Sequence, residues 1–351
     1  MRQSGNILTL NAMRGLMAVV VVLFHYTNNY VLAIVTSFAM SFFFMLSGFL
    51  LARKYDFAEL DRGAYKSFLG RRLWRVYPLH IAVLLVFALK FAAEYVFMGK
   101  NSDQWGYFLP QALLVQSWLP FGQVYLKLNG VSWFLSSIVF CYACYPLVMR
   151  GLRRLGIPAQ VAVLALALGV MMFAAVPLTG TAKRWMVYIC PLMRLVDFAT
   201  GIVLFHIWQR FSCTLTKRRS VLRETMAEIA VMIAICVLFV LQYTDYLDRF
   251  NSEPFTLVLN AALILLLVAH DRGRGLMARA LEWRVFQWLG RVSFEMYMLQ
   301  LIVLILMINF AEITGIVRHE PLSLILYLAV LLALSWLCNK GQSWLTERRC
   351  K

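Results

Sequence analysis

Arg14 and His25 are the residues of this chain best placed to do chemistry. They stand eleven positions apart in LNAMRGLMAVVVVLFHYTNNY, a segment that is otherwise almost wholly apolar. At about 100° per residue this spacing is three turns plus about 20°, so both side chains leave one face of a single helix, about 16 Å apart along its axis. An imidazole can act as a base or carry a group covalently, and a guanidinium can bind an anion. Because such groups in a membrane helix normally face a polar cavity, we expect a buried active site here.

A second group of cations, Arg71, Arg72 and Arg75, stands in GRRLWRVYPLH immediately before an apolar stretch. Positions three and four apart share a helix face, so Arg72 and Arg75 can converge on one anion. The planar fork of arginine suits phosphate, which a nucleotide-bearing substrate would supply. Arginines next to a membrane also set topology or bind anionic lipid, so the pattern alone leaves both interpretations open.

Ser47 and Gly48 lie between aromatic residues and leucines in SFFFMLSGFLLARKY. Small residues in membrane helices usually allow two helices to approach closely. A glycine can equally leave room for a thin ligand. These two residues are therefore candidates either for a cavity wall or for helix packing.

Three pairs of opposite charges stand at helical spacing in or beside apolar stretches. Pairing lowers the cost of placing a charge in a membrane, so each pair can be structural. Arg194 and Asp197, in CPLMRLVDFATGIVL, lie well inside an apolar stretch, and we favour an architectural role for them over a chemical one. The three pairs are Lys90 with Glu94, Arg194 with Asp197, and Arg291 with Glu295.

The helices that must position these residues are predicted to span a membrane. The 351 residues are 62% hydrophobic and 15% charged, and the mean hydropathy is +0.72. Apolar stretches near the length of about 20 residues that crosses hydrocarbon recur along the chain. We expect one all-α transmembrane domain over 1–351, a polytopic bundle of about ten helices with no appended soluble domain. The predicted spans are 12–30, 33–52, 78–98, 131–149, 158–178, 190–209, 227–243, 254–270, 286–310 and 322–339.

The net charge of +17 is explained by topology. Ten spans place both termini on one side, and most of the 34 Lys and Arg residues fall in the segments on that side. This is the positive-inside pattern, which predicts that both termini are cytoplasmic. Nucleic-acid binding is then unnecessary to account for the charge, and we expect no nucleic-acid partner.

No metal site is expected. Cys141 and Cys144 have C-x-x-C spacing, but no second pair and no nearby histidine completes a zinc site, and the motif lies inside an apolar helix. Seven cysteines, scattered mostly in or beside spans, do not form a disulfide framework. They are better interpreted as small packing residues.

Taken together, the motifs resemble the acyltransferase family 3 membrane proteins, which O-acylate carbohydrates of bacterial envelopes. The resemblance runs from the first predicted span to the ninth, and it rests on the joint order of the motifs, because each is weak alone. The matching segments are LNAMRGLMAVVVVLFHY, SFFFMLSGFLLAR, RRLWRVYP, SWFLSSIVFCYACYP, PLMRLVDFATGIVL and LGRVSFEMYMLQ.

The resemblance implies a multi-pass acyltransferase of the inner (cytoplasmic) membrane that uses acyl-CoA, such as acetyl-CoA, as a co-substrate without a tightly bound cofactor. The acceptor would be a hydroxyl of an extracytoplasmic or lipid-linked carbohydrate, and the other partners would be membrane lipids. By motif position, His25 takes the place of the family's catalytic histidine, as base or acyl carrier. Arg14, Arg72 and Arg75 take positions implicated in acyl-CoA binding. We expect a water-accessible slot that leads from these arginines to His25.

The chain departs from the family pattern at two positions. Ile138 stands where the fourth-span motif often carries a glutamate, and Gln300 stands where the ninth span often ends in a histidine. Roles that depend on those residues are therefore not carried over.

Two other functions remain open. A transporter or flippase would also place charges around a cavity in the middle of the membrane, although we find no repeated pair of interrupted spans. A scaffolding or lipid-interaction protein would account for the basic segments, but not for the shared face of Arg14 and His25.

Overall fold

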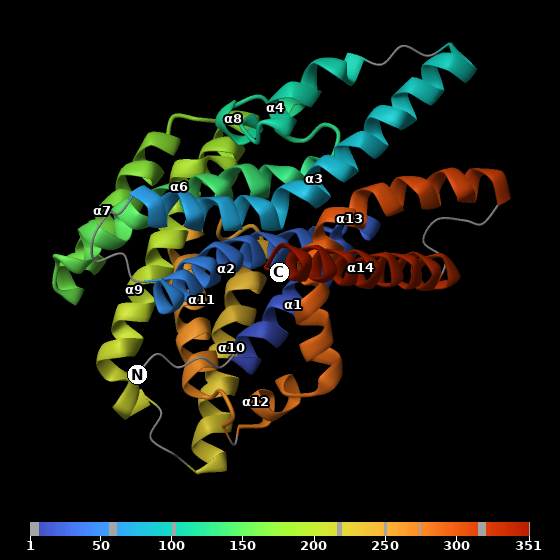
Figure 1. The fold of residues 1–351 in the computed structure, drawn as a ribbon. Helices are drawn as coiled ribbons and strands as arrows, with labels where there is room; N and C mark the ends of the chain where they lie inside the picture. The colour runs from blue at the N-terminus through green and yellow to red at the C-terminus, as the bar shows by residue number, and fades with distance from the viewer. Residues whose placement is uncertain are drawn as a thin grey trace.

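The computed structural model describes residues 7–55, 62–99, 103–215, 220–248, 251–273, 275–314 and 321–350. Throughout these residues the chain forms helices and connecting segments, without a β-strand, which confirms the predicted all-α class (Figure 1). The ten long helices are α1 (Leu8–Thr27), α2 (Tyr30–Lys54), α3 (Arg62–Met98), α6 (Trp133–Arg153), α7 (Ile157–Ala175), α9 (Pro191–Leu215), α10 (Val221–Tyr243), α11 (Glu253–Ala269), α13 (Arg284–Thr314) and α14 (Pro321–Cys350).

Within the described residues, nine helical segments are long and apolar enough to cross a membrane. The other long helix, α11, is apolar but has only 17 residues, and it corresponds to the predicted span 254–270. The polytopic bundle of about ten helices is thus confirmed. Which side of the membrane holds the termini stays a prediction.

Short helices connect the long ones. Five lie between α3 and α6, and the others precede α9 and α13. They are η1 (Asp103–Tyr107), α4 (Phe108–Ala112), η2 (Gln116–Trp118), α5 (Gly122–Tyr125), η3 (Gly130–Ser132), α8 (Gly180–Arg184), η4 (Trp185–Ile189, a turn of π-helix) and α12 (Leu276–Leu281).

The turn between α1 and α2 is built by two asparagines. Asn28 ends α1 in the left-handed conformation (φ 51°), where asparagine is tolerated better than most residues. The Asn29 side chain then accepts hydrogen bonds from the backbone N–H groups of Val31 and Leu32, which caps α2. The two helices therefore form a tight antiparallel hairpin with His25 near the turn.

Helix α3 begins much earlier than the predicted span 78–98. It starts at Arg62 and continues through Pro78, which lacks an N–H and removes one helical hydrogen bond without ending the helix. Arg72 and Arg75 consequently lie on a continuous helix, as their spacing requires for a shared face.

Glycines set the two most extensive helix interfaces, α1 with α13 and α2 with α9. A Cβ added at Gly15 would lie 2.5 Å from the backbone N of Gly290 on α13. A Cβ added at Gly48 would lie 1.9 Å from the carbonyl oxygen of Phe198, and one at Gly201 would lie 1.9 Å from that of Met45. At these crossings no larger residue fits, so the backbones themselves are in contact.

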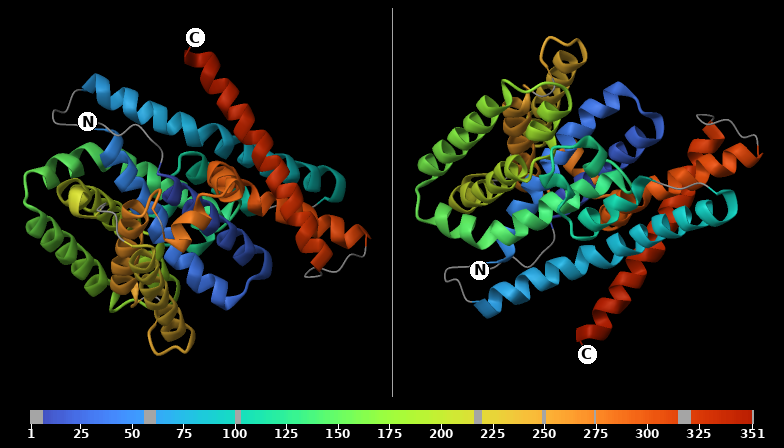
Figure 2. Two further views of the ribbon diagram at one scale, coloured as in Figure 1. Left: turned by 90° about the horizontal axis from the view of Figure 1, so that it is seen from below. Right: turned by 90° about the horizontal axis from the view of Figure 1, so that it is seen from above.

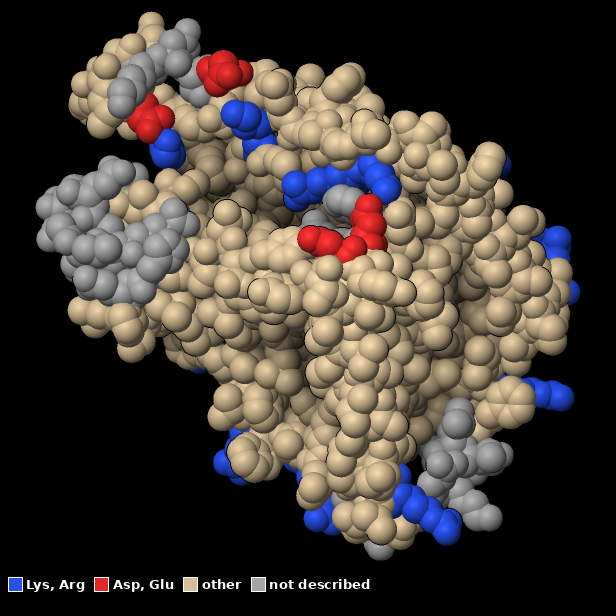
Figure 3. Space-filling model, turned by 180° about the vertical axis from the view of Figure 1, so that it is seen from behind, with Lys and Arg blue, Asp and Glu red and all other residues tan. Residues whose placement is uncertain are grey.

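The most buried long helices are α9 and α2, followed by α13, while α7 and α14 lie at opposite edges (Figure 2). Seen from behind, the surface carries a broad uncharged band (Figure 3). Acidic side chains on this face gather above the band, whereas only Lys and Arg are seen at the lower edge (Figure 3). Such an uncharged band suits a surface that faces hydrocarbon.

Candidate active site

A pocket of about 850 Å³ lies between six of the long helices. Its volume falls in the range of about 300–1,000 Å³ that is usual for small-molecule sites. Polar and charged side chains line it together with leucines and aromatic rings. The polar and charged ones are Asn11 and Arg14 of α1, Ser47, Arg53 and Lys54 of α2, Arg72 and Arg75 of α3, Tyr142 of α6, Arg291, Ser293 and Tyr297 of α13, and Asn339 of α14.

The structure brings Arg14, Arg72 and Arg75 into this one pocket, although they come from two different helices of the chain. Arg14 donates through Nη2 to Oδ1 of Asn11 (3.1 Å) and to the carbonyl oxygen of Gly290. Its Nε is buried and has no hydrogen-bond partner among the described residues. Arg14 therefore keeps donor capacity while it is held by α13.

Arg72 is surrounded by aromatic rings. Its guanidinium carbon lies 5.2 Å from the ring centroid of Tyr55, 5.7 Å from that of Phe68 and 5.8 Å from that of Tyr142. These distances are typical of cation–π contacts, which fix the guanidinium without consuming its hydrogen-bond donors. Arg72 can thus keep its fork for an anion.

Tyr55 reports the positive charge at this end of the pocket. Burial raises the pKa of its phenol, but the charges of Arg72, Lys54 and Arg71 outweigh burial and hold that pKa below its ordinary value. Arg71 itself is exposed, donates to Ser67 and does not line the pocket.

Among the pocket residues that the sequence did not identify as site candidates are Arg53, Lys54 and Asn339, and Arg291 was assigned only to a charge pair. Arg53 and Lys54 end α2 and look like ordinary topology-setting cations. Arg291 was expected to pair with Glu295, four residues further on. Instead, Oε1 of Glu295 accepts a hydrogen bond from Asn339 on α14 (2.9 Å), and the cations that act on this carboxylate are Arg75 and Arg14.

Glu295 is the acidic counterpart of the pocket. It is 3% exposed, and its Oε2 has no hydrogen-bond partner among the described residues. The spacing of Arg291 and Glu295 drew attention to these charges in the ninth span. Only the packing of α13 against α1 and α3 shows which cations interact with the Glu295 carboxylate.

His25 lies on the face of α1 that was predicted. Arg14 contacts Gly290 of α13. About three turns further along the same two helices, His25 lies beside the side chain of Gln300. Both members of the predicted pair therefore face α13. His25 Nδ1 lies 2.8 Å from the carbonyl oxygen of Val21. A carbonyl only accepts, so Nδ1 carries the proton of the neutral ring and Nε2 keeps the lone pair.

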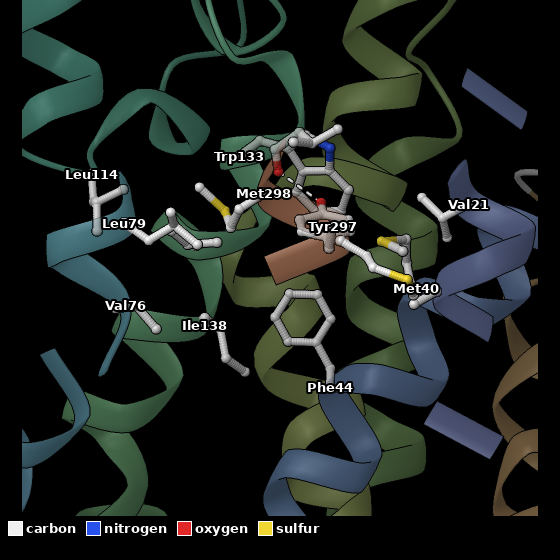
Figure 4. Close-up of a cluster of buried hydrophobic side chains, with 14 of the residues drawn as sticks. Val21, Met40, Phe44, Val76, Leu79, Leu114, Trp133, Ile138, Tyr297 and Met298 are labelled. Carbon is white, nitrogen blue, oxygen red and sulfur yellow. Dashed lines mark hydrogen bonds between the residues drawn. The ribbon is translucent and has the colours of Figure 1, made fainter. Parts of the chain in front are cut away.

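Among the described residues, the pocket that holds the arginines does not extend to His25, contrary to the expected open slot. His25 is absent from the residues that line the pocket, whose wall on that side includes Phe134 and Tyr297. Their ring centroids are 5.4 Å apart, and the Tyr297 hydroxyl donates to the carbonyl oxygen of Val131 (2.7 Å). Figure 4 shows Tyr297 and Met298 within a packed cluster that also contains Val21 and Met40. The physical reason is that apolar side chains of α1, α2, α6 and α13 close on one another here.

This closed layer is thin. Tyr297 lines the pocket and Gln300 lies beside His25, and the two are three residues apart on α13. Three helical residues rise about 4.5 Å. The pocket and His25 are thus separated by about one helical turn of packed side chains.

Ser47 and Gly48 have different positions. Ser47 lines the pocket, and its Oγ donates to the carbonyl oxygen of Phe43 (2.8 Å). Gly48 faces α9 and allows its close crossing with α2. Of the two candidates, Ser47 lies at the cavity and Gly48 serves helix packing.

Arg194 and Asp197 form a fully buried ion pair (2.7 Å) away from the pocket. Arg194 also pairs with Glu253 of α11 (3.0 Å) and donates to Ser41 of α2 (2.9 Å) and to the carbonyl oxygen of Val187 (2.8 Å). These contacts join α2, α9, η4 and α11, which agrees with the architectural interpretation.

Residues 7–340 match the acyltransferase domain of acyltransferase family 3. Among curated proteins, the chain is similar to Acyltransferase MdmB of Streptomyces mycarofaciens, with 32% identity over 185 residues, which are 48% of this chain and 46% of that protein. The chain thus spans about half the length of this relative. No solved structure matches it. Since the family match covers nearly every helix described above, this multi-pass membrane protein belongs to acyltransferase family 3.

Proposed function

We propose that this protein is a membrane O-acyltransferase. It takes an acyl group, such as acetyl, from acyl-CoA and transfers it to a hydroxyl of an extracytoplasmic or lipid-linked carbohydrate. The observation that carries the proposal is the position of Arg14, Arg72 and Arg75 in one pocket, with His25 further along the same face of α1. Membership of the acyltransferase family supports the reaction class.

The donor would bind with its phosphates among the pocket cations. Arg72 and Arg75 can each offer two donors to a phosphate, and Arg14 keeps a free Nε deeper in the bundle. The nucleotide would remain at the basic end of the pocket while the thin pantetheine arm extends toward His25. This arrangement moves no charge into hydrocarbon.

His25 would then carry out the transfer. Acting as a base, Nε2 removes the proton of the acceptor hydroxyl, and the hydroxyl oxygen attacks the thioester carbonyl. The C–S bond breaks, the thiolate leaves as CoA, and the imidazolium returns the proton to it. Acting as a carrier, the same nitrogen would first attack the thioester and release the CoA thiolate. The acceptor hydroxyl would then attack the acyl-imidazolium, the N–acyl bond would break, and the hydroxyl proton would go to the thiolate.

The layer formed by Phe134 and Tyr297 has to open for either route. Donor binding would separate these rings. Closing the layer would also keep water away from the thioester, which protects it from hydrolysis.

The distribution of charge along the chain supports a proposal for the side of the membrane from which each substrate enters. With the basic end of the bundle in the cytoplasm, acyl-CoA would enter from the cytoplasm and the acceptor from the far side of the cytoplasmic membrane. Acetyl-CoA as donor, an envelope glycan as acceptor and the surrounding lipids as further partners belong to this proposal.

Acyl transfer by the purified protein tests the proposal. Protein in lipid vesicles is given acetyl-CoA labelled in the acetyl group together with glycans from the host envelope, and labelled glycan and free thiol are measured. We expect equal amounts of both products. A transporter would move substrate across the vesicle without consuming thioester, and that result would overturn the proposal. Mass spectrometry of envelope glycans with and without the gene then identifies the acceptor.

A further inference from the structure

Gln300 is the polar side chain next to His25, and its orientation is fixed. It is fully buried on α13, and its Nε2 donates to the carbonyl oxygen of Tyr297 (2.9 Å). Because a carbonyl accepts only, the NH₂ group of the amide must face Tyr297, and Oε1 is left on the other side. Oε1 has no hydrogen-bond partner among the described residues.

The neutral His25 ring leaves this oxygen unsatisfied. Nδ1 of His25 is occupied by the carbonyl oxygen of Val21, so the nitrogen available toward Gln300 is Nε2, which carries a lone pair. A lone pair and an amide oxygen cannot hydrogen-bond to each other. A buried acceptor without a donor is costly, with a penalty of about 1–3 kcal/mol in general. The contact becomes favourable only when a proton resides on Nε2.

The backbone of Gln300 is held by α14. The Tyr327 hydroxyl donates to the carbonyl oxygen of Gln300 (3.2 Å), and the Tyr327 ring stacks on Tyr26 of α1 at 5.0 Å. Tyr26 in turn donates to Oγ of Ser323 (2.9 Å). His25 and Gln300 therefore lie in a rigid junction of α1, α13 and α14.

We propose that Gln300 is a positioning residue for His25, whose Oε1 stabilises the positive charge of the imidazolium formed during acyl transfer, while the Nε2–H itself points to the reacting oxygen and then to the thiolate. This inference rests on the proposed function with His25 as the base. When the acceptor O–H bond breaks, the proton moves to Nε2 and the electron pair of that bond goes to the attacking oxygen. Oε1 of Gln300 then stabilises the positive ring until Nε2 gives its proton to the departing CoA thiolate.

Other titratable groups near His25 do not offer this stabilisation. The phenols of Tyr26, Tyr327 and Tyr297 are engaged with Ser323, the Gln300 carbonyl and the Val131 carbonyl.

Charged side chains lie further away. Helix α2 has none from Tyr30 to Ala52, and α14 has none from Pro321 to Asn339. Glu253 of α11 is paired with Arg194, and the charge of Glu295 of α13 interacts with Arg75 and Arg14.

The test is the pH dependence of acyl transfer by full-length variants in lipid vesicles. With Gln300→Met, which has nearly the same shape but no acceptor, we expect kcat to fall about 10-fold or more at unchanged KM for acetyl-CoA, because hydrogen bonds to charged groups are the stronger ones. Transfer needs the neutral His25 ring, and the imidazolium is less stable without Oε1 of Gln300. We therefore expect the acidic limb of the rate profile to move to lower pH in Gln300→Met.

A second variant makes the test independent of folding losses. Gln300→Glu restores an acceptor and adds negative charge, so we expect the acidic limb to move to higher pH by about one unit. Gln242→Met is the matched control, because Gln242 is also a buried glutamine with a side-chain hydrogen bond, to Ser252, and should lower stability without moving the profile.

The outcomes separate the two proposals. If both Gln300 variants keep the wild-type pH profile, and Gln300→Met behaves like Gln242→Met, the positioning role of Gln300 is refuted while the transferase remains. If the wild-type protein transfers no acyl group, or His25→Ala transfers it normally, the proposed function itself fails.

Discussion

Gly15 of α1 and Gly290 of α13 lie back to back, so close that a Cβ added at Gly15 would be 2.5 Å from the backbone N of Gly290. This contact brings Arg14 within reach of the Gly290 carbonyl and, further along the same two helices, brings His25 beside Gln300. One close crossing therefore positions both the deepest cation of the pocket and the proposed base.

Gly15→Ala should disturb both sites at once. The added methyl group has only backbone atoms and the Leu289 side chain to displace, so α1 must move away from α13. We expect the free energy of unfolding to fall by about 1–3 kcal/mol, as for other overpacked interiors. Acyl transfer should fall as well. Gly169→Ala on α7, where nothing lies within 4 Å of the new methyl group, is the control: it should leave acyl transfer unchanged and, through the better helix propensity of alanine, should not lower stability. Equal stability of the two variants in detergent would contradict the close crossing.

Arg72→Gln and Arg75→Gln should weaken binding of CoA. Each removes charge-assisted hydrogen bonds to phosphate, for which a loss of about 10-fold or more in affinity is expected. Calorimetric titration with CoA measures this directly, and the wild-type affinity should decrease as salt increases. Arg71→Gln is a matched control because it removes the same charge from the neighbouring position, outside the pocket. An affinity loss for Arg71→Gln as large as for Arg72→Gln would argue against a defined phosphate site.

Glu295→Gln should have the opposite effect. Its carboxylate neutralises part of the charge of Arg14 and Arg75, and it would repel the phosphates of a bound donor. Removing that charge should tighten CoA binding by about tenfold. Glu94→Gln, in the Lys90 pair on α3, is the control for a general change in charge. Weaker CoA binding in Glu295→Gln would mean that the carboxylate mainly holds the arginines in place.

Arg194→Met should lower the free energy of unfolding far more than breaking an ion pair at the edge of the bundle. It leaves Asp197 and Glu253 buried without their cation, a change that typically costs about 3–5 kcal/mol. Lys90→Met breaks an i,i+4 pair at the bundle edge, for which about 0.3–0.5 kcal/mol is usual. Thermal unfolding in detergent compares the two. Similar unfolding midpoints would show that the Arg194 network is not structural.

The parts of the site predicted from the sequence are those that a single helix determines. The eleven-residue spacing predicted that Arg14 and His25 share a face, and both lie against α13. The i,i+3 spacing predicted that Arg72 and Arg75 can converge on one anion, and both line the same pocket. Hydropathy likewise identified the nine helical segments among the described residues that are long enough to cross a membrane, and the shorter apolar helix α11.

The features of the site that the sequence did not predict depend on which helices pack together. Arg53 lies at the end of α2 and Asn339 in the second half of α14, and nothing local indicates that both line the same pocket as Arg14. Glu295 looked like a partner for Arg291 because both are on one helix, yet it faces Arg75 and Arg14 from neighbouring helices. The closed layer of Phe134 and Tyr297 also results from packing between helices far apart in sequence.

The central claim is that the pocket binds the donor and His25 does the chemistry, so the two functions can be separated. Purified wild-type and His25→Ala proteins should be compared for CoA affinity and for transfer of a labelled acetyl group in the same preparations. We expect His25→Ala to bind CoA within about twofold of wild type while transfer falls by about 10² or more, the usual range for loss of a general base. Normal transfer by a correctly inserted His25→Ala protein would contradict the account.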